Sequence, residues 1–309
     1  MAKTKDLTNS ITFEGLTWEN ITRPTEKTVE RLSKKHKFHH LDLEDCLSKI
    51  QRPKIDEYDK YLFLVLHFPY YDKATDSIQQ DEVNIFVGGS YVITLSPGNK
   101  VLNTLFEKVK RRKTLKQKYM GTTSGYLLYH IIDEMFGECF PLIDNLSAQI
   151  DELEAGVFEL DNPRDMLKET LSTKKDIINY RRIIIPQRTL IAQLEHKNKK
   201  FLPENLDVYF DDVVDKVEKI YNNIETLWDI VASLHETNES ILSHNTNNII
   251  KILTIFSVIM LPLTFVTGLY GMNVVLPLDT HPLAFFAIIG ILVLIVALML
   301  IFFRVKKWI

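Results

Sequence analysis

The segment Leu283-Ala-Phe-Phe-Ala-Ile-Ile-Gly-Ile-Leu-Val-Leu-Ile-Val-Ala-Leu-Met-Leu-Ile-Phe-Phe303 contains 21 consecutive uncharged residues, almost all of them apolar. At about 1.5 Å of rise per residue, a helix of this length reaches roughly 30 Å, which is the thickness of the hydrocarbon core of a bilayer. The segment therefore predicts a membrane-spanning helix, and it decides that the chain is a membrane protein.

A second uncharged segment, Ile252 to Leu269, lies shortly before the first. Its 18 residues include hydroxyl-bearing side chains, Pro262 and Gly268, so it suits a protein-lined or water-lined environment better than lipid. The connection, residues 270–282, has to stay on one side of the membrane, which places both flanks on the other side. Basic residues in these flanks predict that they are cytoplasmic. They are Lys251, Arg304, Lys306 and Lys307.

The first 250 residues are polar and acidic, with 33 lysine and arginine residues against 39 aspartate and glutamate residues, a net charge of −6. Nucleic-acid binding needs clustered positive charge, so no nucleic-acid partner is expected, and the acidic balance suits a surface that handles cations. Cys46 and Cys139 form no paired framework and indicate reduced thiols. The N-terminal sequence has no apolar stretch of the signal-peptide type, so this domain is expected to be cytoplasmic.

Upstream of the first span, apolar residues from Val213 to Ile241 recur at alternating three- and four-residue steps, which predicts one apolar stripe on a long helix. No proline lies between Pro203 and Pro262. A continuous helix from Pro203 to Leu269 would have 67 residues and reach roughly 100 Å. We expect a stalk that continues into the membrane, with its stripe supplying a contact between copies of the chain.

Apolar residues from Ile143 to Leu160 predict another helix, which ends at Asn162-Pro163, where a further helix begins and runs to about Lys197. The two are expected to form an antiparallel hairpin. The acidic end of the hairpin is either a solvated helix face or a surface that attracts cations. Its carboxylates are Asp151, Glu152, Glu154, Glu159, Asp161 and Asp165.

Residues 1–120 contain β-branched and aromatic runs bounded by Asp, Gly and Pro, at Tyr61–Tyr71, Val83–Val87 and Tyr91–Leu95. With helical patterns on either side, they predict an α+β domain with a small sheet in an α/β/α-like arrangement. The predicted organisation is a cytoplasmic α/β domain (1–120), a cytoplasmic helical hairpin (121–202), a stalk helix continuing into the first transmembrane helix (203–269), an external loop (270–282), a second transmembrane helix (283–303) and a basic cytoplasmic tail (304–309).

One face of the first span mixes apolar and small polar side chains at three- and four-residue steps. This pattern indicates either ordinary helix packing through small residues or the lining of a pore. Because one helix cannot enclose a pore, the second interpretation requires several copies of the chain. The residues on this face are Asn247, Ile250, Leu253, Ser257, Leu261, Thr264 and Gly268.

The tetrapeptide Tyr270-Gly271-Met272-Asn273 follows the first span. Mg²⁺ prefers oxygen ligands and holds its water shell tightly, so neutral oxygens suit recognition of the hydrated ion. Asn273 offers an amide oxygen, and Gly271 lets the backbone expose a carbonyl. A Gly-x-Asn sequence alone is a weak signal, but its place between two spans strengthens it.

The tetrapeptide comes directly after Met260-Leu-Pro-Leu-Thr-Phe-Val-Thr-Gly-Leu269, and the second span precedes a Lys-Lys-Trp-Ile end. In these features the chain resembles the CorA family of magnesium transporters. Three segments of the soluble domain extend the likeness over most of the chain. They are Leu43-Glu-Asp-Cys-Leu47, Gln51-Arg-Pro-Lys54 and Tyr61-Leu-Phe-Leu-Val65.

The resemblance implies a homopentamer in the cell (inner) membrane, with both termini cytoplasmic and the first transmembrane helices lining a pore. The transported ion would be Mg²⁺ first, with Co²⁺ and Ni²⁺ as further cargo. Gly271, Met272 and Asn273 would form the selectivity filter, and the face described above would line the pathway. Glu236 falls where the family often has an acidic ring lower in the funnel.

The same resemblance implies that cytoplasmic Mg²⁺ regulates the pore. Glu44 and Asp45 of one subunit and Asp212 of its neighbour would bind the ion. Bound cations would cancel the repulsion between these carboxylates and hold a closed, symmetric ring, and their loss would loosen it. Mg²⁺ is then both cargo and regulator, and no organic cofactor is expected.

The outer loop departs from the family, which usually carries acidic residues there, because Asp279 is the only charged residue in the loop from Val274 to His281. The ion preference therefore stays open. A Zn²⁺ transporter of the same architecture, as in the ZntB family, is one alternative. Its candidate ligands are His39, His40, Glu44, His235 and His244.

A membrane-anchored cation sensor that does not conduct is an alternative of a different class. An anchor needs only lipid-facing apolar residues, so the polar stripe of the first span argues against it. The sequence contains no nucleophile elbow, phosphate loop, zinc-protease motif or paired catalytic carboxylates, so an enzyme is not expected.

Overall fold

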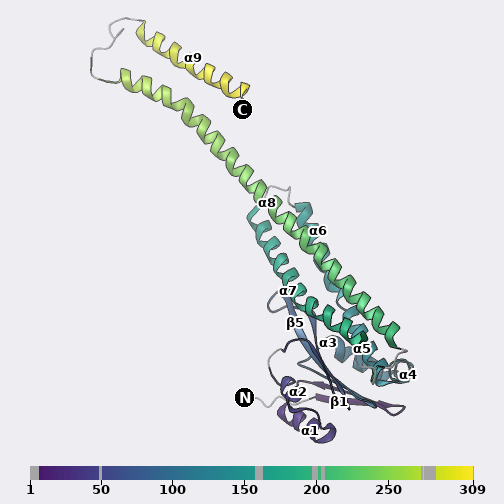
Figure 1. The fold of residues 1–309 in the computed structure, drawn as a ribbon. Coiled ribbons are helices and arrows are strands. Elements are labelled where there is room, and N and C mark those ends of the chain that lie inside the picture. The colour runs from purple at the N-terminus through teal and green to yellow at the C-terminus, as the bar shows by residue number, and fades with distance from the viewer. Residues whose placement is uncertain are drawn as a thin grey trace. The chain divides into compact units, whose positions relative to one another are not determined.

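The computed structural model describes residues 7–48, 51–156, 163–196, 201–202, 206–272, 274 and 283–308. The chain divides into two compact units, Met1–His235 and Glu236–Ile309. Helix α8 (Asp207–Tyr270) is assigned as one α-helix and contributes residues to both units. Figure 1 shows the elements in chain order.

A mixed sheet forms the centre of the first unit. Within the described residues it has six strands in the order β1-β2-β6-β5-β4-β3. All neighbours pair antiparallel except β2 and β6, which are parallel. Residues 62–66 are completely buried, as expected for a strand that is covered on both faces. The strands are β1 Leu7–Phe13, β2 Leu16–Thr22, β3 Lys54–Glu57, β4 Leu62–Asp72, β5 Ser77–Val87 and β6 Tyr91–Ser96.

Strands β4, β5 and β6 confirm the three predicted strand runs, whereas β1, β2 and β3 lie where no strand was predicted. Strand β1 is an edge strand rich in polar and hydroxyl residues, so it lacks an apolar run. It joins β2 through Glu14 and Gly15, whose φ angles of 47° and 85° give the twist that a two-residue hairpin requires.

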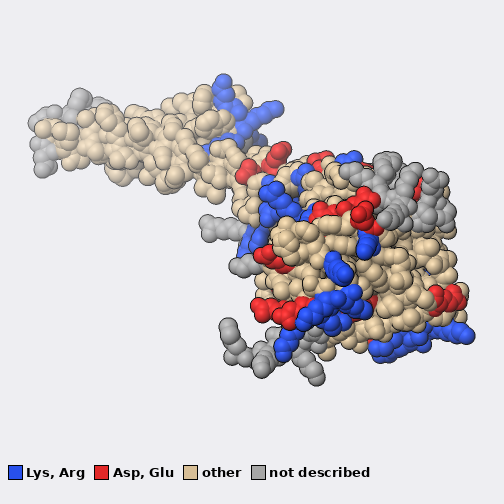
Figure 2. Space-filling model, turned by 60° about the horizontal axis from the view of Figure 1, so that its bottom comes forward, with Lys and Arg blue, Asp and Glu red and all other residues tan. Residues whose placement is uncertain are grey.

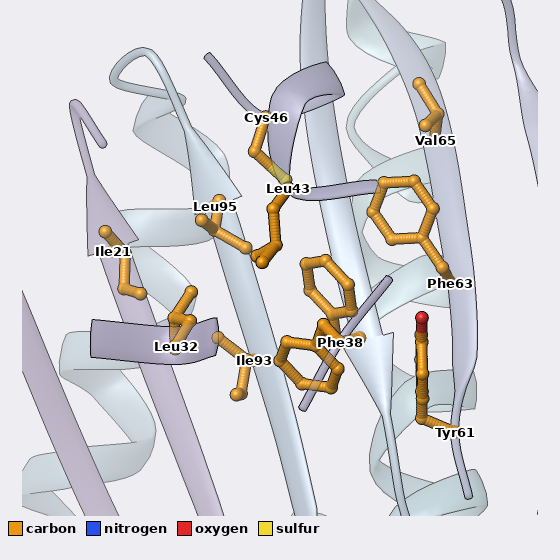
Figure 3. Packing of buried hydrophobic residues seen from close by; sticks show 11 residues of the cluster. Ile21, Leu32, Phe38, Leu43, Cys46, Tyr61, Phe63, Val65, Ile93 and Leu95 are labelled. Atoms are coloured by element: carbon orange, nitrogen blue, oxygen red, sulfur yellow. The ribbon is translucent and has the colours of Figure 1, made fainter. Parts of the chain in front are cut away.

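Helices cover both faces of the sheet. On one face, Leu32 of α1 (Glu26–His36) and Leu43 of α2 (His40–Asp45) enter an apolar cluster with the strands (Figure 3). On the other face, the Trp18 ring meets Phe106 edge-on, with 4.9 Å between ring centroids. The helices of this second layer are α3 Lys100–Arg111, α4 Lys113–Met120 and α5 Ser124–Gly137. The predicted α/β/α-like arrangement is confirmed.

The predicted hairpin consists of α6 (Phe140–Gly156) and α7 (Pro163–His196), which pack against each other. Helix α7 also attaches directly to the sheet. The Asp176 carboxylate accepts a 2.8 Å hydrogen bond from the backbone N–H of Ile78, and the Asn179 amide donates a 3.1 Å bond to the Ile78 carbonyl. Strand β6 pairs with β5 only from Asn84 onward. The Asp176 and Asn179 side chains therefore provide hydrogen bonds to the Ile78 backbone, which β6 does not reach.

The apolar stripe of α8 is buried within one copy of the chain, since Val213, Ile220 and Val231 are completely inaccessible. Polar contacts hold α7 beside it, including a 2.7 Å ion pair between Arg181 and Glu225. The expectation that the stripe forms a contact between copies was therefore wrong. Its apolar surface is already covered by the helices of the same unit.

Two helices, α8 and α9 (Ala284–Val305), contain stretches long and apolar enough to cross a membrane. The described residues of the second unit are mostly tan in Figure 2, with Lys and Arg gathered at one end. There, the Lys251 ammonium donates a 3.3 Å hydrogen bond to the Lys307 carbonyl. The two basic flanks thus lie at the same end of the unit, as predicted.

Candidate ion pathway and regulatory carboxylates

The predicted pathway residues of α8 lie on a face that no other part of the second unit covers. Ile250, Leu253 and Leu261 are 54%, 64% and 71% exposed. The remaining members of the face, Glu236, Asn247, Ser257, Thr264 and Gly268, are also exposed. The structure therefore places all eight predicted pathway residues on helix surface that is free in one copy of the chain.

The opposite face of α8 packs toward α9. Ile255 is 9% exposed on α8, and Phe303 is 4% exposed on α9. Ile255 and Thr264 are nine residues apart, which at about 100° per residue puts their side chains on opposite sides of the helix. Helix α9 accordingly leaves the polar stripe uncovered.

Hydroxyl groups on α8 donate their protons to the helix backbone. Ser257 Oγ donates to the Leu253 carbonyl, and Thr264 Oγ1 donates to the Met260 carbonyl, each at 2.8 Å. A hydroxyl has one proton and two lone pairs, so a hydroxyl that donates in this way keeps acceptor capacity. Both residues thus present neutral oxygen acceptors on the exposed face, which is the chemistry that the waters around a cation require.

The proposed filter begins where α8 ends. The backbone N–H of Gly271 donates a 2.9 Å hydrogen bond to the Thr267 carbonyl, and Met272 is 54% exposed. A Cβ added at Gly271 would lie only 3.1 Å from the Thr267 oxygen, so a larger residue would disturb this close turn. Asn273 lies outside the described residues.

Asp45, one of the proposed regulatory ligands, is already paired with a lysine. Lys54 Nζ lies 2.8 Å from Oδ2 of Asp45 and 2.6 Å from Oδ2 of Asp56. Burial alone would lower the pKa of Lys54, but the hydrogen bonds to the two aspartates outweigh it and raise that pKa above its usual value. Lys54 is a functional candidate that the sequence analysis missed, although it ends the segment Gln51–Lys54 that carries the family resemblance.

Helix α2 is held in place by a buried carboxylate. Asp42 is 1% exposed and accepts hydrogen bonds from the Tyr58 and Tyr61 hydroxyls at 3.1 and 2.7 Å. Burial raises the pKa of Asp42, and the two tyrosine bonds partly offset this effect. Asp42 therefore fixes the helix on which Glu44 and Asp45 stand, with Glu44 exposed to solvent.

Asp212 lies in the early turns of α8 and is exposed. Its charge reaches Tyr129, whose pKa is raised to about 12 mainly by burial and further by Asp133 and Asp212. In the part of the chain that the structure describes, no three His, Cys, Asp or Glu side chains are placed to hold a metal ion. One copy of the chain thus does not unite Glu44, Asp45 and Asp212.

The same finding applies to the histidine alternative. The rings of His39 and His40 are adjacent, with 4.6 Å between centroids, but His39 Nδ1 accepts a hydrogen bond from the Leu41 backbone. His244 Nδ1 lies 3.2 Å from the Asn248 amide. Among the described residues, these histidines belong to no metal-binding group of three.

The chain combines a three-layer domain with two apolar helices, which are the C-terminal part of α8 and helix α9. With the polar stripe on α8, these features define a membrane-embedded transport protein with two spans. A family described as "CorA-like Mg2+ transporter protein" matches residues 13–307. The chain belongs to this CorA-like family, whose members transport divalent cations and are not enzymes.

Individual relatives agree with this assignment. The Cobalt/magnesium transport protein CorA of Thermotoga maritima is 29% identical over 99% of this chain and 88% of that protein. The complete structure of the CorA magnesium transporter from Methanocaldococcus jannaschii superposes with a TM-score of 0.84 and 22% identity, covering 100% of both chains, which shows the shared fold. The Zinc transport protein ZntB of Pectobacterium carotovorum is 22% identical over 67% of this chain and 66% of that protein.

Proposed function

We propose that this chain is a homopentameric channel for divalent cations, with Mg²⁺ as the main cargo and Co²⁺ and Ni²⁺ as further ions. The observation that carries the proposal is the uncovered face of α8, where Ser257 and Thr264 retain acceptor oxygens between apolar neighbours. Such a face offers neutral acceptors to water and suits a water-filled path between copies of the helix. The family assignment and the names of the relatives support the choice of ion.

Selection of the ion is assigned to Gly271, Met272 and Asn273. A neutral amide oxygen binds a hydrated cation through the waters of the ion, so the ion keeps the shell that Mg²⁺ loses reluctantly. The end of α8 at Tyr270 supports this assignment because Gly271 and Met272 lie outside the helix, directly before Asn273 in the sequence. An uncharged filter also holds the ion weakly enough to release it.

Regulation is assigned to Mg²⁺ bound between copies, by Glu44 and Asp45 of one and Asp212 of the next. Two features support it. Glu44 and Asp212 are exposed, and α2 is fixed to the sheet by Asp42, so a cation bound at its carboxylates would pull on a rigid element. Ion binding would then favour the closed arrangement by its higher affinity for that state.

Flux through liposomes tests the proposal. The full-length protein is reconstituted with an internal Mg²⁺-sensitive dye, and external Mg²⁺ is added at low internal Mg²⁺. We expect Mg²⁺ influx that requires the protein and that slows when the starting internal Mg²⁺ concentration is raised. Protein that binds Mg²⁺ but passes none would be a sensor rather than a channel.

The zinc alternative is supported by one of the relatives, the zinc transport protein. It predicts Zn²⁺ uptake that excess Mg²⁺ does not reduce. If Mg²⁺ is the main cargo, Mg²⁺ competes with Zn²⁺ and suppresses its uptake in the same liposomes. Competition therefore distinguishes the two ions in one experiment.

A further inference from the structure

An apolar groove lies between the two helices of the second unit. Its volume is about 390 Å³, and every described residue that lines it is apolar. Val293 and Leu300 are 63% and 43% exposed. Leu263 is displaced by about 100° around α8 from its neighbour Thr264, so the groove lies away from the proposed pathway. The lining residues are Leu263 of α8 and Leu292, Val293, Val296, Ala297 and Leu300 of α9.

The groove has the depth of one leaflet of a bilayer. Leu300 and Leu292 lie four and twelve residues before Arg304, so along α9 the groove extends from roughly 6 to 18 Å from that arginine. One half of the hydrocarbon core is roughly 15 Å thick. On α8, Leu263 likewise lies twelve residues from Lys251. A lipid whose headgroup lies at the level of these two basic residues therefore has the groove beside its acyl chain.

A basic side chain continues the groove face of α9. Val293, Ala297, Leu300 and Arg304 follow one another at steps of four, three and four residues, so all four lie on one face of the helix. Arg304 is exposed and lies at the end of the second unit where Lys and Arg gather (Figure 2). Among the described residues, no carboxylate forms an ion pair with the basic residues of this end. They are Lys251, Arg304, Lys306 and Lys307.

The turn that ends α9 presents a lysine and a tryptophan at the same end. Lys307 has a φ of 56°, and the N–H groups of Lys307 and Trp308 donate bonds of 3.0 and 2.9 Å to the carbonyls of Arg304 and Phe303. This is the Schellman motif, in which glycine is the usual residue at the position of Lys307. The Trp308 ring stacks on Phe303, with 5.8 Å between centroids, and stays 44% exposed. Lysine is a costly residue at this position, and exposed tryptophan is typical of a membrane interface.

We propose that this basic end and the adjoining groove form a site for one anionic phospholipid, with the headgroup phosphate at Arg304 and an acyl chain in the groove. The guanidinium matches a phosphate in geometry and charge, and the neighbouring lysines favour a headgroup with net negative charge. A second copy of the chain fits less well, because in a parallel assembly its own basic end would lie at the same level and repel this one. The site goes beyond the proposed transport function and does not depend on conduction.

Quenching of Trp308 fluorescence tests the site in the full-length protein, reconstituted in phosphatidylcholine nanodiscs. Phosphatidylglycerol or phosphatidylcholine, brominated near the glycerol end of its acyl chains, replaces a rising fraction of the lipid. The other two tryptophans, Trp18 and Trp228, lie in the first unit, and the Trp308→Phe variant measures their background. We expect half-maximal quenching of Trp308 at a fraction of brominated phosphatidylglycerol at least fivefold below that of brominated phosphatidylcholine.

Two pairs of variants assign the headgroup and chain contacts. One basic residue beside an anionic headgroup contributes a factor of about five, so Arg304→Gln should raise the half-quenching fraction of phosphatidylglycerol about fivefold. Lys60→Gln, at an exposed lysine of the first unit, should leave it unchanged. Ala297→Phe fills the groove and should raise the fraction at least threefold. Leu298→Phe, at a 57% exposed residue about 100° further around α9, should not.

A thermal melt and the size of the purified oligomer check that the variants are folded. The proposal is overturned if the two brominated lipids quench Trp308 alike, if Arg304→Gln keeps the full preference, or if Ala297→Phe and Leu298→Phe behave alike. Absence of quenching in the unmodified protein would also overturn it and would indicate that another copy of the chain covers the site. The readout is lipid binding, so a failure of Mg²⁺ flux leaves each of these outcomes unchanged.

Discussion

Lys54 holds its ammonium nitrogen 2.8 Å from the carboxylate of Asp45, the residue that we propose as a regulatory Mg²⁺ ligand. The amine thus neutralises a charge that a metal ion would use. A Mg²⁺ ion that binds Asp45 has to displace Lys54 or share the carboxylate with it, and in either case the lysine lowers the apparent affinity. Lys54 therefore sets the Mg²⁺ concentration at which the proposed site fills.

Lys54→Met should make closure more sensitive to Mg²⁺. A partly exposed ion pair is worth about 0.2–1 kcal/mol, so the half-closing Mg²⁺ concentration should fall by about 1.4- to fivefold. Flux at a series of internal Mg²⁺ concentrations measures it. Lys60→Met, at an exposed lysine of the same region, is the control and should leave the value unchanged. An unaltered response in Lys54→Met would show that Lys54 does not compete with the ion.

Asp45→Asn combined with Asp212→Asn should weaken closure by Mg²⁺. Amides keep the shape of the side chains but remove the charges whose repulsion the ion relieves. We expect flux that persists at internal Mg²⁺ concentrations that close the unmodified channel. The measurement is the same liposome assay, and the regulatory assignment fails if the Mg²⁺ dependence of the double variant is unchanged.

Thr264→Val should reduce Mg²⁺ flux several-fold while the protein remains folded. The substitution keeps the shape of the side chain and removes an oxygen that faces the proposed pathway. Thr267→Val is a matched control because Thr267 makes the same kind of bond, to the Leu263 carbonyl at 2.9 Å, but its side chain points about 60° away from that of Thr264 around the helix. Equal effects of the two variants would indicate a loss of helix stability and not of pathway oxygens.

Asn273→Ala should abolish selective Mg²⁺ transport without unfolding the protein. The amide oxygen is the proposed contact to the hydrated ion, and alanine offers no replacement. Flux of Mg²⁺ with unchanged selectivity would exclude Asn273 from the filter. Asn248→Ala, at an exposed asparagine of α8 outside the stripe, provides the comparison.

The stability of the first unit should decrease as the pH falls below about 6.5. Burial, with a smaller contribution from Lys118, lowers the pKa of His130 to about 4. Between about pH 6.5 and 4 the unfolded chain binds a proton that the folded chain does not, so acid favours unfolding; at pH 5 this amounts to about 2 kcal/mol. Above pH 6.5 both states are neutral at this residue and the contribution to stability is complete.

His130→Phe should remove that part of the pH dependence, because phenylalanine fills the aromatic site beside Tyr119 and Tyr126 without titrating. Melting temperatures of the reconstituted protein at pH 7.5 and pH 5 give the comparison. His40→Gln, at an exposed histidine, should keep the acid sensitivity. Equal losses of melting temperature in His130→Phe and the unmodified protein would contradict the prediction.

The features that the sequence determined by itself are those that repeat locally. Each local pattern predicts one kind of element: a long apolar run predicts a span, an apolar stripe predicts a helix, and a β-branched run predicts a strand. Both spans, the hairpin, the long helix and strands β4 to β6 were therefore predictable. The face of α8 that carries Ser257 and Thr264 followed from the helical period alone. Strand β1 did not, because its polar residues have no periodic apolar signal.

Only the tertiary structure decided which surfaces meet. Periodicity shows that the stripe at Val213 is buried but not by what, and the fold covers it with helices of the same unit. The pairing of Lys54 with Asp45 and the bond between Lys251 and the Lys307 carbonyl likewise depend on how distant segments pack. A local pattern indicates whether a residue is buried or exposed. Which residues it contacts depends on the free energy of the whole packed chain.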